Sequence, residues 1–478
     1  MIRFRTFTIF LVPIFLGACA VGPEYRAPQP PLSASGPFIT KSDATTPDRK
    51  SIQAKWWRLY HDPILDRLVQ DALAANTDVR VAVARLARAR ANLRQTSADR
   101  LPDTGISANL NRQRQSATQV LPGVDRENTG VDLGLNVAYE IDLFGRVRRN
   151  VEAARGDYQA AEADLDAVRV STVAATIRAY LGAASAAQRL TVAEQIIVLL
   201  DRSIAVTKSR EEAGLTTQLD TARITTLRDQ RRSSIPTLIA EREAQLYRIA
   251  LLTGRTPKDL PAEVRTITKL PTIDQQMPVG DGMALLARRP DVRASERRLA
   301  AETARIGVAT SDLYPRVSVG ASLGSTSFGF GDAFGAGPLR WLVGPMISWS
   351  FPNQERIRSR IDSATADTQA ALAALDGAVL QALNETETAL SNYARSLDRH
   401  DALVAAEAQA KKVARIVRAE LREGRIDSLS LLDAERTYAD TQANLADSGA
   451  QVANAQVDVF LALGGGWEAS NGDLAAER

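Results

Sequence analysis

Residues 130–150 read GVDLGLNVAYEIDLFGRVRRN, and from Val131 to Leu143 every second residue is apolar. Side chains alternate between the two faces of a β-strand, so this pattern predicts a strand of about 13 residues with one apolar and one polar, acidic face. The apolar face carries Val131, Leu133, Leu135, Val137, Tyr139 and Ile141. Because the sequence on either side favours long helices, this strand requires its own explanation.

Three further segments show the same alternation, at 104–113, 316–326 and 340–351, with the first strand placed at 130–143. Their lengths match the roughly 9–11 residues that a tilted strand needs to cross a bilayer. On the apolar face of the last strand, Trp341 and Trp349 are expected at the two lipid–water boundaries. A half-buried sheet packed on helices would alternate in the same way, so the pattern alone leaves a soluble alternative open.

The rest of the chain predicts helices of unusual length. It has 478 residues, 45% of them hydrophobic but only 5% aromatic, a composition that favours long helices over a mixed core. No proline interrupts residues 146–213, and small or apolar residues recur there at helical spacing. This helix and its counterpart at 355–423 would each be about 100 Å long. Shorter helices are expected to stack beside them, at 76–100, 217–253, 290–313 and 427–463.

The two halves of the chain resemble each other. REEAGLTTQLDTAR at 210–223 is echoed by LREGRIDSLSLLDAER at 421–436, which pairs Gly214 with Gly424. Each half therefore reads helix, strand, loop, strand, very long helix, turn and helix, as expected for an internal repeat. Four strands cannot close a membrane barrel, because membrane barrels begin at about eight strands and hydrocarbon does not tolerate open sheet edges. Copies must combine, and three copies would supply about twelve strands.

These elements divide the chain into consecutive segments. They are a signal peptide at 1–18, a lipidated N-terminal and equatorial segment at 19–75, an α-barrel helix at 76–102, a β-hairpin at 103–144, α-barrel helices at 145–254, an equatorial linker at 255–289, an α-barrel helix at 290–314, a second β-hairpin at 315–352, α-barrel helices at 353–464 and a tail at 465–478.

The amino terminus reads MIRFRTFTIFLVPIFLGAC, with a basic start, an apolar run and then small residues. This is typical of a secretory signal, which is too short to span a bilayer as a mature helix. Cys19 is the only cysteine, and its context resembles the bacterial lipoprotein signal, in which this residue is lipidated. In that class, Ala20 after the cysteine indicates the outer membrane; an ordinary signal peptide with a stray cysteine is the alternative.

Several function classes find no support in the sequence. The formal charge is +3 and no basic domain stands apart, which argues against nucleic-acid binding. His61 and His400 are far apart and lack a cysteine cluster, so no metal site is expected. The glycine-rich stretch at 329–337 lies between predicted strands and opens no helix, unlike a dinucleotide loop. Neither a catalytic set nor a cofactor motif appears, so we expect no enzyme.

Taken together, these features resemble the TolC-type outer-membrane efflux proteins, in the lipoprotein branch that includes OprM and NodT. The resemblance covers nearly the whole mature chain. Its marks are CAVGPEY at 19–25, Trp56-Trp57, EIDLFGR at 140–146, RRPD at 288–291 and LLDAER at 431–436. It implies a homotrimeric tube, with a twelve-strand barrel in outer-membrane lipid and a twelve-helix barrel crossing the periplasm. It also implies a periplasmic adaptor protein and an inner-membrane pump of the resistance–nodulation–division (RND) type as partners.

The same resemblance places a gate at the tip of the tube, around the turns at 211–220 and 423–433. The family carries acidic residues there, and Asp433 falls on that pattern, with Leu429 one turn earlier. Some members have a second aspartate where this chain has Ser430, so Asp220 is a candidate to supplement the acidic ring. Arg436, one turn from Asp433, is expected to bridge neighbouring helices or else to be a surface charge.

The expected function is a passive trimeric exit duct for small toxic compounds, gated at its periplasmic tip and located in the outer membrane of a Gram-negative bacterium. Two alternatives stay open at this point. One is a duct for polypeptide secretion, which would share the architecture. The other is a structural envelope spacer that conducts nothing.

Overall fold

The structure is a computed structural model, and it describes residues 20–29, 34, 36–40, 44–46, 55–116, 118–121, 123, 125–273, 276–331, 333–335 and 337–465. The expected signal peptide, Cys19 and the tail beyond residue 465 lie outside the described residues. The chain forms two compact units. We call them the sheet unit, from residues within 1–27, 88–159 and 296–373, and the helical unit, from residues within 28–87, 160–295 and 374–478.

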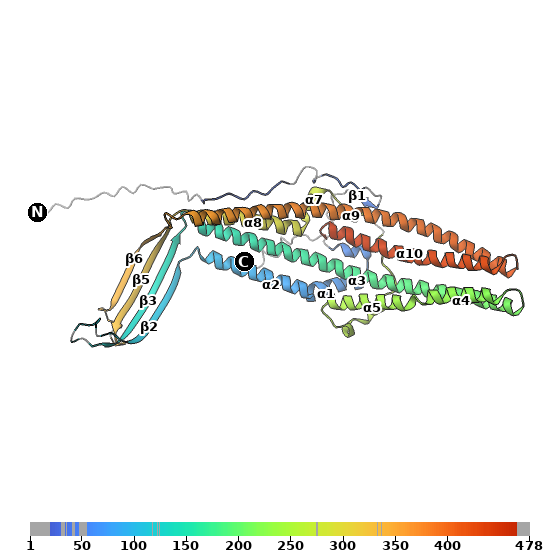
Figure 1. Cartoon of the computed structure of the whole chain (residues 1–478), viewed down its shortest axis with the longest axis horizontal. Helices are drawn as coiled ribbons and strands as arrows, with labels where there is room; N and C mark the ends of the chain where they lie inside the picture. Colours follow the sequence, from blue (N-terminus) through green and yellow to red (C-terminus); the bar gives the residue numbers. More distant parts are fainter. Residues whose placement is uncertain are drawn as a thin grey trace. The chain divides into compact units, whose positions relative to one another are not determined.

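The sheet unit contains one antiparallel sheet of four strands (Figure 1). Its strands are β2 (Asp103–Arg114), β3 (Glu127–Ile141), β5 (Arg316–Phe328) and β6 (Leu339–Ser348), in the order β2-β3-β5-β6. Strands β2 and β6 are therefore the edges. Because neighbours run in opposite directions, one end of the sheet holds the starts of β2 and β5 and the ends of β3 and β6. We call this end the foot of the sheet.

The strand register places the apolar residues of all four strands on one face. Leu135 lies opposite Ile106 on one side and Leu323 on the other, and Leu323 lies opposite Trp341. The predicted set Leu133, Leu135, Val137, Tyr139, Ile141 and Trp341 shares this face. On the opposite face, the Arg340 guanidinium lies 3.0 Å from the Asp132 carboxylate across β5. The alternation seen in separate strands thus adds up to one sheet with an apolar and a polar face.

Val131 and Trp349, two of the residues predicted to face the membrane, have surroundings that differ from the prediction. Val131 lies on the apolar face but is only 2% exposed, at the end where Ser325 Oγ donates to the carbonyl of Ala333 in the β5–β6 loop. Trp349 lies beyond β6, because Ser348 already pairs with the first residue of β5 and no strand partner remains. Its indole nitrogen instead donates to the Leu313 carbonyl at 3.1 Å.

The turn from the sheet into the next helix explains the EIDLFGR sequence. Asp142 accepts hydrogen bonds from the backbone nitrogens of Val147 and Arg148, at 3.0 and 2.9 Å, and so satisfies the helix N-terminus. Glu140 and Arg146 form a two-bond ion pair of 2.6 and 2.7 Å across the same turn. The helix therefore starts at a fixed position directly after the sheet.

The helices are close to those predicted. The long pair is α3 (Arg146–Glu212) and α9 (Glu355–Arg422), with 67 and 68 residues, hence about 100 Å each. The others are α1 (Pro63–Ala75), α2 (Thr77–Ala98), α4 (Gln218–Arg232), α5 (Ile235–Leu252), α6 (Ala262–Arg265), α7 (Gly282–Arg288), α8 (Pro290–Ser311) and α10 (Ser428–Ala462), with the short helices η2 (Trp56–Tyr60) and η3 (Pro257–Asp259) and the paired strands β1 (Thr45–Thr46) and β4 (Met277–Pro278). Within the described residues, none of these helices combines the length and apolar character needed to cross a membrane.

The single helix predicted over 217–253 is wrong. The structure has two helices there, α4 and α5, separated at Ser233 and Ser234. Pro236, in the first turn of α5, explains the break. Proline lacks a backbone N–H and disfavours helical geometry in the residue before it, whereas it is well accommodated at the start of a helix.

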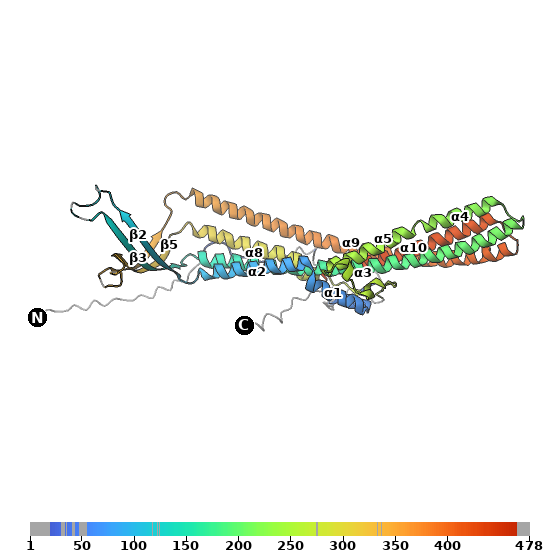
Figure 2. The ribbon, with the colours of Figure 1, turned by 90° about the horizontal axis from the view of Figure 1, so that it is seen from below.

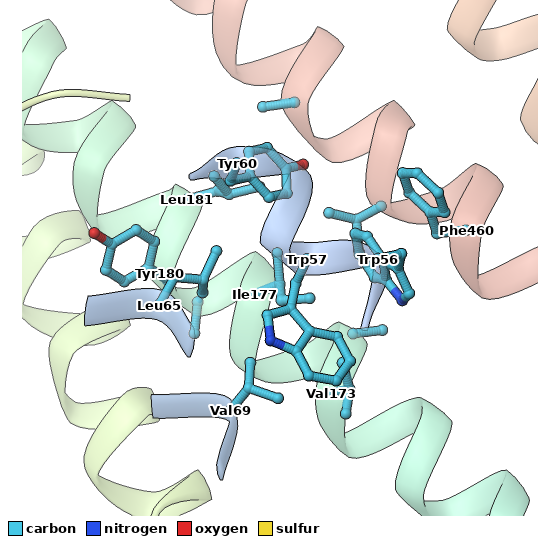
Figure 3. Packing of buried hydrophobic residues seen from close by; sticks show 14 of the residues in the cluster. Trp56, Trp57, Tyr60, Leu65, Val69, Val173, Ile177, Tyr180, Leu181 and Phe460 are labelled. Carbon is cyan, nitrogen blue, oxygen red and sulfur yellow. The ribbon is translucent and has the colours of Figure 1, made fainter. Parts of the chain in front are cut away.

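The core of the helical unit is built around the Trp56-Trp57 pair (Figure 3). Trp56 stacks on Phe460 of α10, with ring centroids 4.2 Å apart and planes 14° apart. Trp57 is buried as well, and its indole nitrogen donates to Asp66 at 2.9 Å. The same cluster contains Ile177 of α3, so segments distant in the sequence meet in one apolar core.

Replacement of Trp56 by alanine is expected to destabilise the helical unit by about 3–5 kcal/mol, because it removes a large buried ring and leaves a cavity. Trp56 is 1% exposed. Thermal unfolding followed by far-ultraviolet circular dichroism would measure the loss. Ile39→Ala is the matched control, since Ile39 is 88% exposed and should change little. Equal unfolding temperatures for the two variants would contradict this prediction.

Candidate functional site

Two helix–turn–helix corners meet at one end of the helical unit (Figures 1 and 2). The α3–α4 corner passes through Gly214 and the α9–α10 corner through Gly424, both with a φ of 71°. This left-handed conformation is costly for residues with a side chain, which explains the glycines. The Thr216 and Ser428 hydroxyls lie 3.0 Å apart and join the two corners. We call this region the tip.

The tip carries two carboxylates at helix starts, Asp220 in the first turn of α4 and Asp427 directly before α10. Asp220 accepts from the Thr216 hydroxyl at 2.7 Å, and Asp427 accepts from the Ser430 backbone nitrogen at 2.9 Å. The hydrogen bond from the Thr216 hydroxyl is the main cause that lowers the pKa of Asp220. The pKa of Asp427 is lowered mainly by the hydrogen bond from the Ser430 hydroxyl, although the negative charge of Asp220 acts to raise it. Ser430 thus supports a neighbouring acid.

The other gate candidates lie on one exposed face of α10. Leu429 is 53% exposed, and Asp433 and Arg436 follow at helical spacing on the same side. Within the described part of the chain, neither Asp433 nor Arg436 has an ion pair or a side-chain hydrogen bond. Both charges are therefore available to another helix, and the predicted bridge stays a prediction.

The opposite face of α10 holds a buried charged cluster that the sequence analysis missed. Glu435 is 2% exposed and accepts two hydrogen bonds of 2.6 Å from Arg418 on α9. It also accepts from the Ser203 hydroxyl of α3 at 2.9 Å, and the Arg418 guanidinium lies 5.9 Å from the centre of the Tyr438 ring. We call Ser203, Arg418, Glu435 and Tyr438 the Glu435 cluster. It ties three helices together directly behind the exposed face of α10 that carries the gate candidates Leu429, Asp433 and Arg436, which we call the gate face.

Apolar packing and further ion pairs support the same helices. The apolar cluster near the tip contains Ile196, Leu200, Ile224, Leu227, Leu421, Leu431 and Ala439, from four helices. Farther along α10, its carboxylates pair with arginines of α3 and α4, in the pairs Arg231–Asp440, Arg189–Asp447 and Arg178–Asp458. In these pairs the cations all lie on α3 or α4 and the anions all lie on α10. A row of ion pairs, each with its cation on α3 or α4 and its anion on α10, thus holds α10 to these two helices.

The residues directly after Cys19 are fixed at the foot of the sheet. Val21 donates its backbone N–H to the Phe144 carbonyl at 3.1 Å, and Tyr25 hydrogen bonds to Glu296. Gly145, which has a φ of 82°, has Ala20 so close that an added Cβ would lie 2.6 Å from the Ala20 side chain. Since β3 ends at Ile141 and α3 begins at Arg146, residues 20 and 21 lie where the strands end.

The described residues contain no group of three or more His, Cys, Asp or Glu side chains arranged to hold a metal ion. The candidate site is defined by the shape, charge and helix packing described above. Its parts are an apolar sheet face, a tip with exposed acids and an N-terminal segment anchored beside the sheet.

Comparison with known proteins decides the family. The profile of the outer membrane efflux protein family matches residues 68–255 and 283–465, which together make up most of the chain. The chain belongs to this family. It is 31% identical to the outer membrane protein OprJ of Pseudomonas aeruginosa over 462 residues, which cover 96% of this chain and 95% of OprJ. It is 29% identical to the toluene efflux pump outer membrane protein TtgI of Pseudomonas putida over 476 residues, covering 98% and 99% of the two chains.

The fold agrees with this assignment. The solved structure of the outer-membrane channel OprN superposes with a TM-score of 0.86 at 37% identity, covering 94% of this chain and all of that one. This outer-membrane efflux protein is thus a relative of channel proteins. The family resemblance, the function in efflux and the outer-membrane location predicted from the sequence are confirmed.

Proposed function

We propose that three copies of this outer-membrane efflux protein form one passive exit duct. The observation that carries this proposal is the sheet, which has one apolar face and two edge strands, β2 and β6, whose outer edges have no strand partner among the residues that the structure describes. In hydrocarbon, unpaired backbone groups at such edges are not tolerated, so edges of different copies must pair. Three copies of four strands make a closed barrel of about twelve strands, within the known range of membrane barrels.

In this assembly the apolar face contacts lipid and the polar face lines the lumen. The Asp132–Arg340 pair then lies inside the duct, where charged side chains are hydrated. The long helices α3 and α9, with the shorter helices beside them, form a periplasmic barrel of twelve helix positions from three copies. The matching of the two corners at Gly214 and Gly424 supports the internal repeat on which this arrangement depends.

The gate of the proposed duct is the tip. Three copies of Asp433 near the axis repel one another and favour bound cations, while Leu429 narrows the passage. The exposure of both side chains supports this role. Asp220 adds negative charge from the first corner, and Arg436 links to a neighbouring helix to hold the closed state.

Cys19 is the proposed lipid anchor. Ala20 and Val21 pack beside the turn between β3 and α3, at the foot of the sheet, so an acyl chain on Cys19 would start next to the membrane boundary. This position supports an anchor that attaches to the membrane without spanning it.

The partners proposed for the duct are a periplasmic adaptor protein and an RND-type pump in the inner membrane, which would supply the energy. The cargo class proposed is small toxic compounds, and the name of the relative TtgI, which refers to a toluene efflux pump, supports it. The duct itself needs no cofactor and performs no catalysis in this proposal.

Two measurements on the purified lipidated protein in detergent test the proposal. Native mass spectrometry is expected to show a particle of three chains, and planar bilayers are expected to show discrete channel openings. A stable single chain that binds no detergent would overturn the duct. A trimer that never conducts would favour a structural spacer instead.

Removing the exposed charges of the gate, by Asp433→Ala together with Arg436→Ala, is expected to raise single-channel conductance several-fold, because the Arg436 bridge that holds the closed state and the cations bound by the Asp433 ring both disappear. Planar-bilayer recording at one salt concentration gives the measurement. The matched control is Arg395→Ala with Asp398→Ala, an exposed α9 pair 2.6 Å apart, which should leave conductance unchanged. Unchanged conductance in both double variants would contradict the assignment of the gate.

A further inference from the structure

A basic pocket lies at the foot of the edge strand β6. It has a volume of about 440 Å³ and is bounded by the end of α8, the start of β5, the end of β6 and the first turns of α9. Its charged lining residues are Asp312, Arg316, Arg356 and Arg360. We call it the foot pocket. All of it belongs to the sheet unit.

The foot pocket has more positive than negative charge. Its one carboxylate, Asp312, is shared by Arg316 at 2.5 Å and Arg360 at 3.7 Å. Arg356 also lines the pocket and is exposed, and it has no ion pair among the residues that the structure describes. The pocket therefore has room for a further anion, which would have to come from outside this chain's own lining residues.

The other edge strand, β2, offers a matching anion at the same end of the sheet, the foot. Asp103 is the first residue of β2. Its side chain is exposed and has no ion pair within the described residues. It lies opposite Ala138 of β3, which lies opposite Gly320 of β5. Residues two and four positions along a strand share a face, so Asp103 and Arg316 lie on the same, polar face of the sheet.

We infer that the foot pocket of one copy receives Asp103 of the next copy, with Arg356 as its main partner. This inference rests on the proposed trimeric barrel. Neighbouring strands in the sheet alternate in direction, so β6 and the β2 of the next copy pair antiparallel with foot beside foot. The end of β6 and the start of β2 then come together, and each junction is completed by a carboxylate from the adjoining copy.

The proposed ion pair would do more than hold two copies together, because it would also set the register of the paired strands. A β-strand edge can pair in several registers, and a slip by one residue would move every side chain to the other face. A carboxylate on the first residue of β2 reaches the foot pocket only in a register that brings the start of β2 beside the end of β6 of the adjoining copy. The ion pair thus specifies the alignment of the copies, as charged pairs do at other interfaces.

Charge reversal tests the inference in the full-length lipidated protein. Asp103→Arg and Arg356→Asp are each expected to lower the temperature at which the trimer dissociates on detergent gels, and the double variant is expected to restore most of the loss. Arg358→Asp is the matched control, because Arg358 is an exposed neighbour on α9 that does not line the pocket. Circular dichroism checks that each exposed-site variant keeps its helices.

Cross-linking gives an independent readout. Cys19 is the only natural cysteine, so Asp103→Cys with Arg356→Cys can be joined by a short flexible bis-maleimide with little background. Covalent dimers and trimers are expected, and several-fold fewer from Asp103→Cys with Arg358→Cys. A wild-type protein that forms no trimer overturns the proposed function and this inference together.

If the trimer forms, but neither single reversal changes its dissociation temperature and the cysteine pair gives no cross-link, the inference alone is overturned. The same holds if Arg356→Asp leaves assembly intact and abolishes binding of inorganic phosphate or of phosphatidylglycerol vesicles. In that case the foot pocket would be a site for a free or lipid phosphate.

Discussion

Leu135→Arg is expected to prevent stable assembly in the outer membrane. Leu135 lies near the middle of β3, on the apolar face between Ile106 and Leu323. In the proposed barrel it contacts lipid at about the midplane, where an arginine costs about 2–4 kcal/mol in each copy. The measurement is the fraction of trimer in outer-membrane extracts, together with its dissociation temperature, both of which should fall sharply.

The neighbouring residue supplies the control. Asn136 lies on the opposite, polar face of the same strand, so Asn136→Arg would point into the hydrated lumen and should assemble normally. This pair of variants separates lipid exposure from a general disturbance of β3. If both arginines assemble equally well, or if only Asn136→Arg fails, the assignment of the two faces is wrong.

The strands were predictable because a two-residue period survives even when tertiary contacts are unknown. In β3 the period runs from Val131 to Ile141, and in the structure these residues share one face. The long helices were predictable for a related reason. Their ends are set by local chemistry, such as the Asp142 cap of α3 and the glycines at 214 and 424, which the sequence displays directly.

Other features depend on neighbours that are distant in the sequence. The end of β6 before Trp349 follows from where β5 begins, and the burial of Val131 coincides with the packing of the β5–β6 loop. No local pattern specifies either. The break between α4 and α5 is different, because Pro236 is a local signal for it, although the helical spacing of the residues around it favours one continuous helix.

The candidate site shows the same division. Sequence spacing placed Leu429, Asp433 and Arg436 on one face of α10, and the structure leaves that face exposed. In the proposed trimer, what these charges contact depends on other copies, which a single chain does not contain. The Glu435 cluster carried one usable signal. Leu431, Glu435 and Tyr438 follow the spacing of a buried helix face, so a charge stands where an apolar residue is expected.

Arg418→Met is expected to cost the tip about 3–5 kcal/mol, because it leaves the Glu435 carboxylate buried without its cation. Arg418 donates both of its hydrogen bonds to a side chain that is 2% exposed. The loss should appear as a lower unfolding temperature. It should also raise channel leakage, since Glu435 fixes the rotation of α10 and hence the direction in which Asp433 points.

The double variant Arg418→Met with Glu435→Leu separates these two effects. Replacing a buried ion pair by apolar residues of similar size is often neutral or stabilising, so the unfolding temperature should recover. If leakage persists while stability returns, the Glu435 cluster sets the orientation of the gate face and does not merely hold the helices together. Arg395→Met, which removes an exposed partner of Asp398, should cost at most about 1 kcal/mol and leave the channel closed. A stable, tightly closed Arg418→Met channel would contradict the role assigned to the cluster.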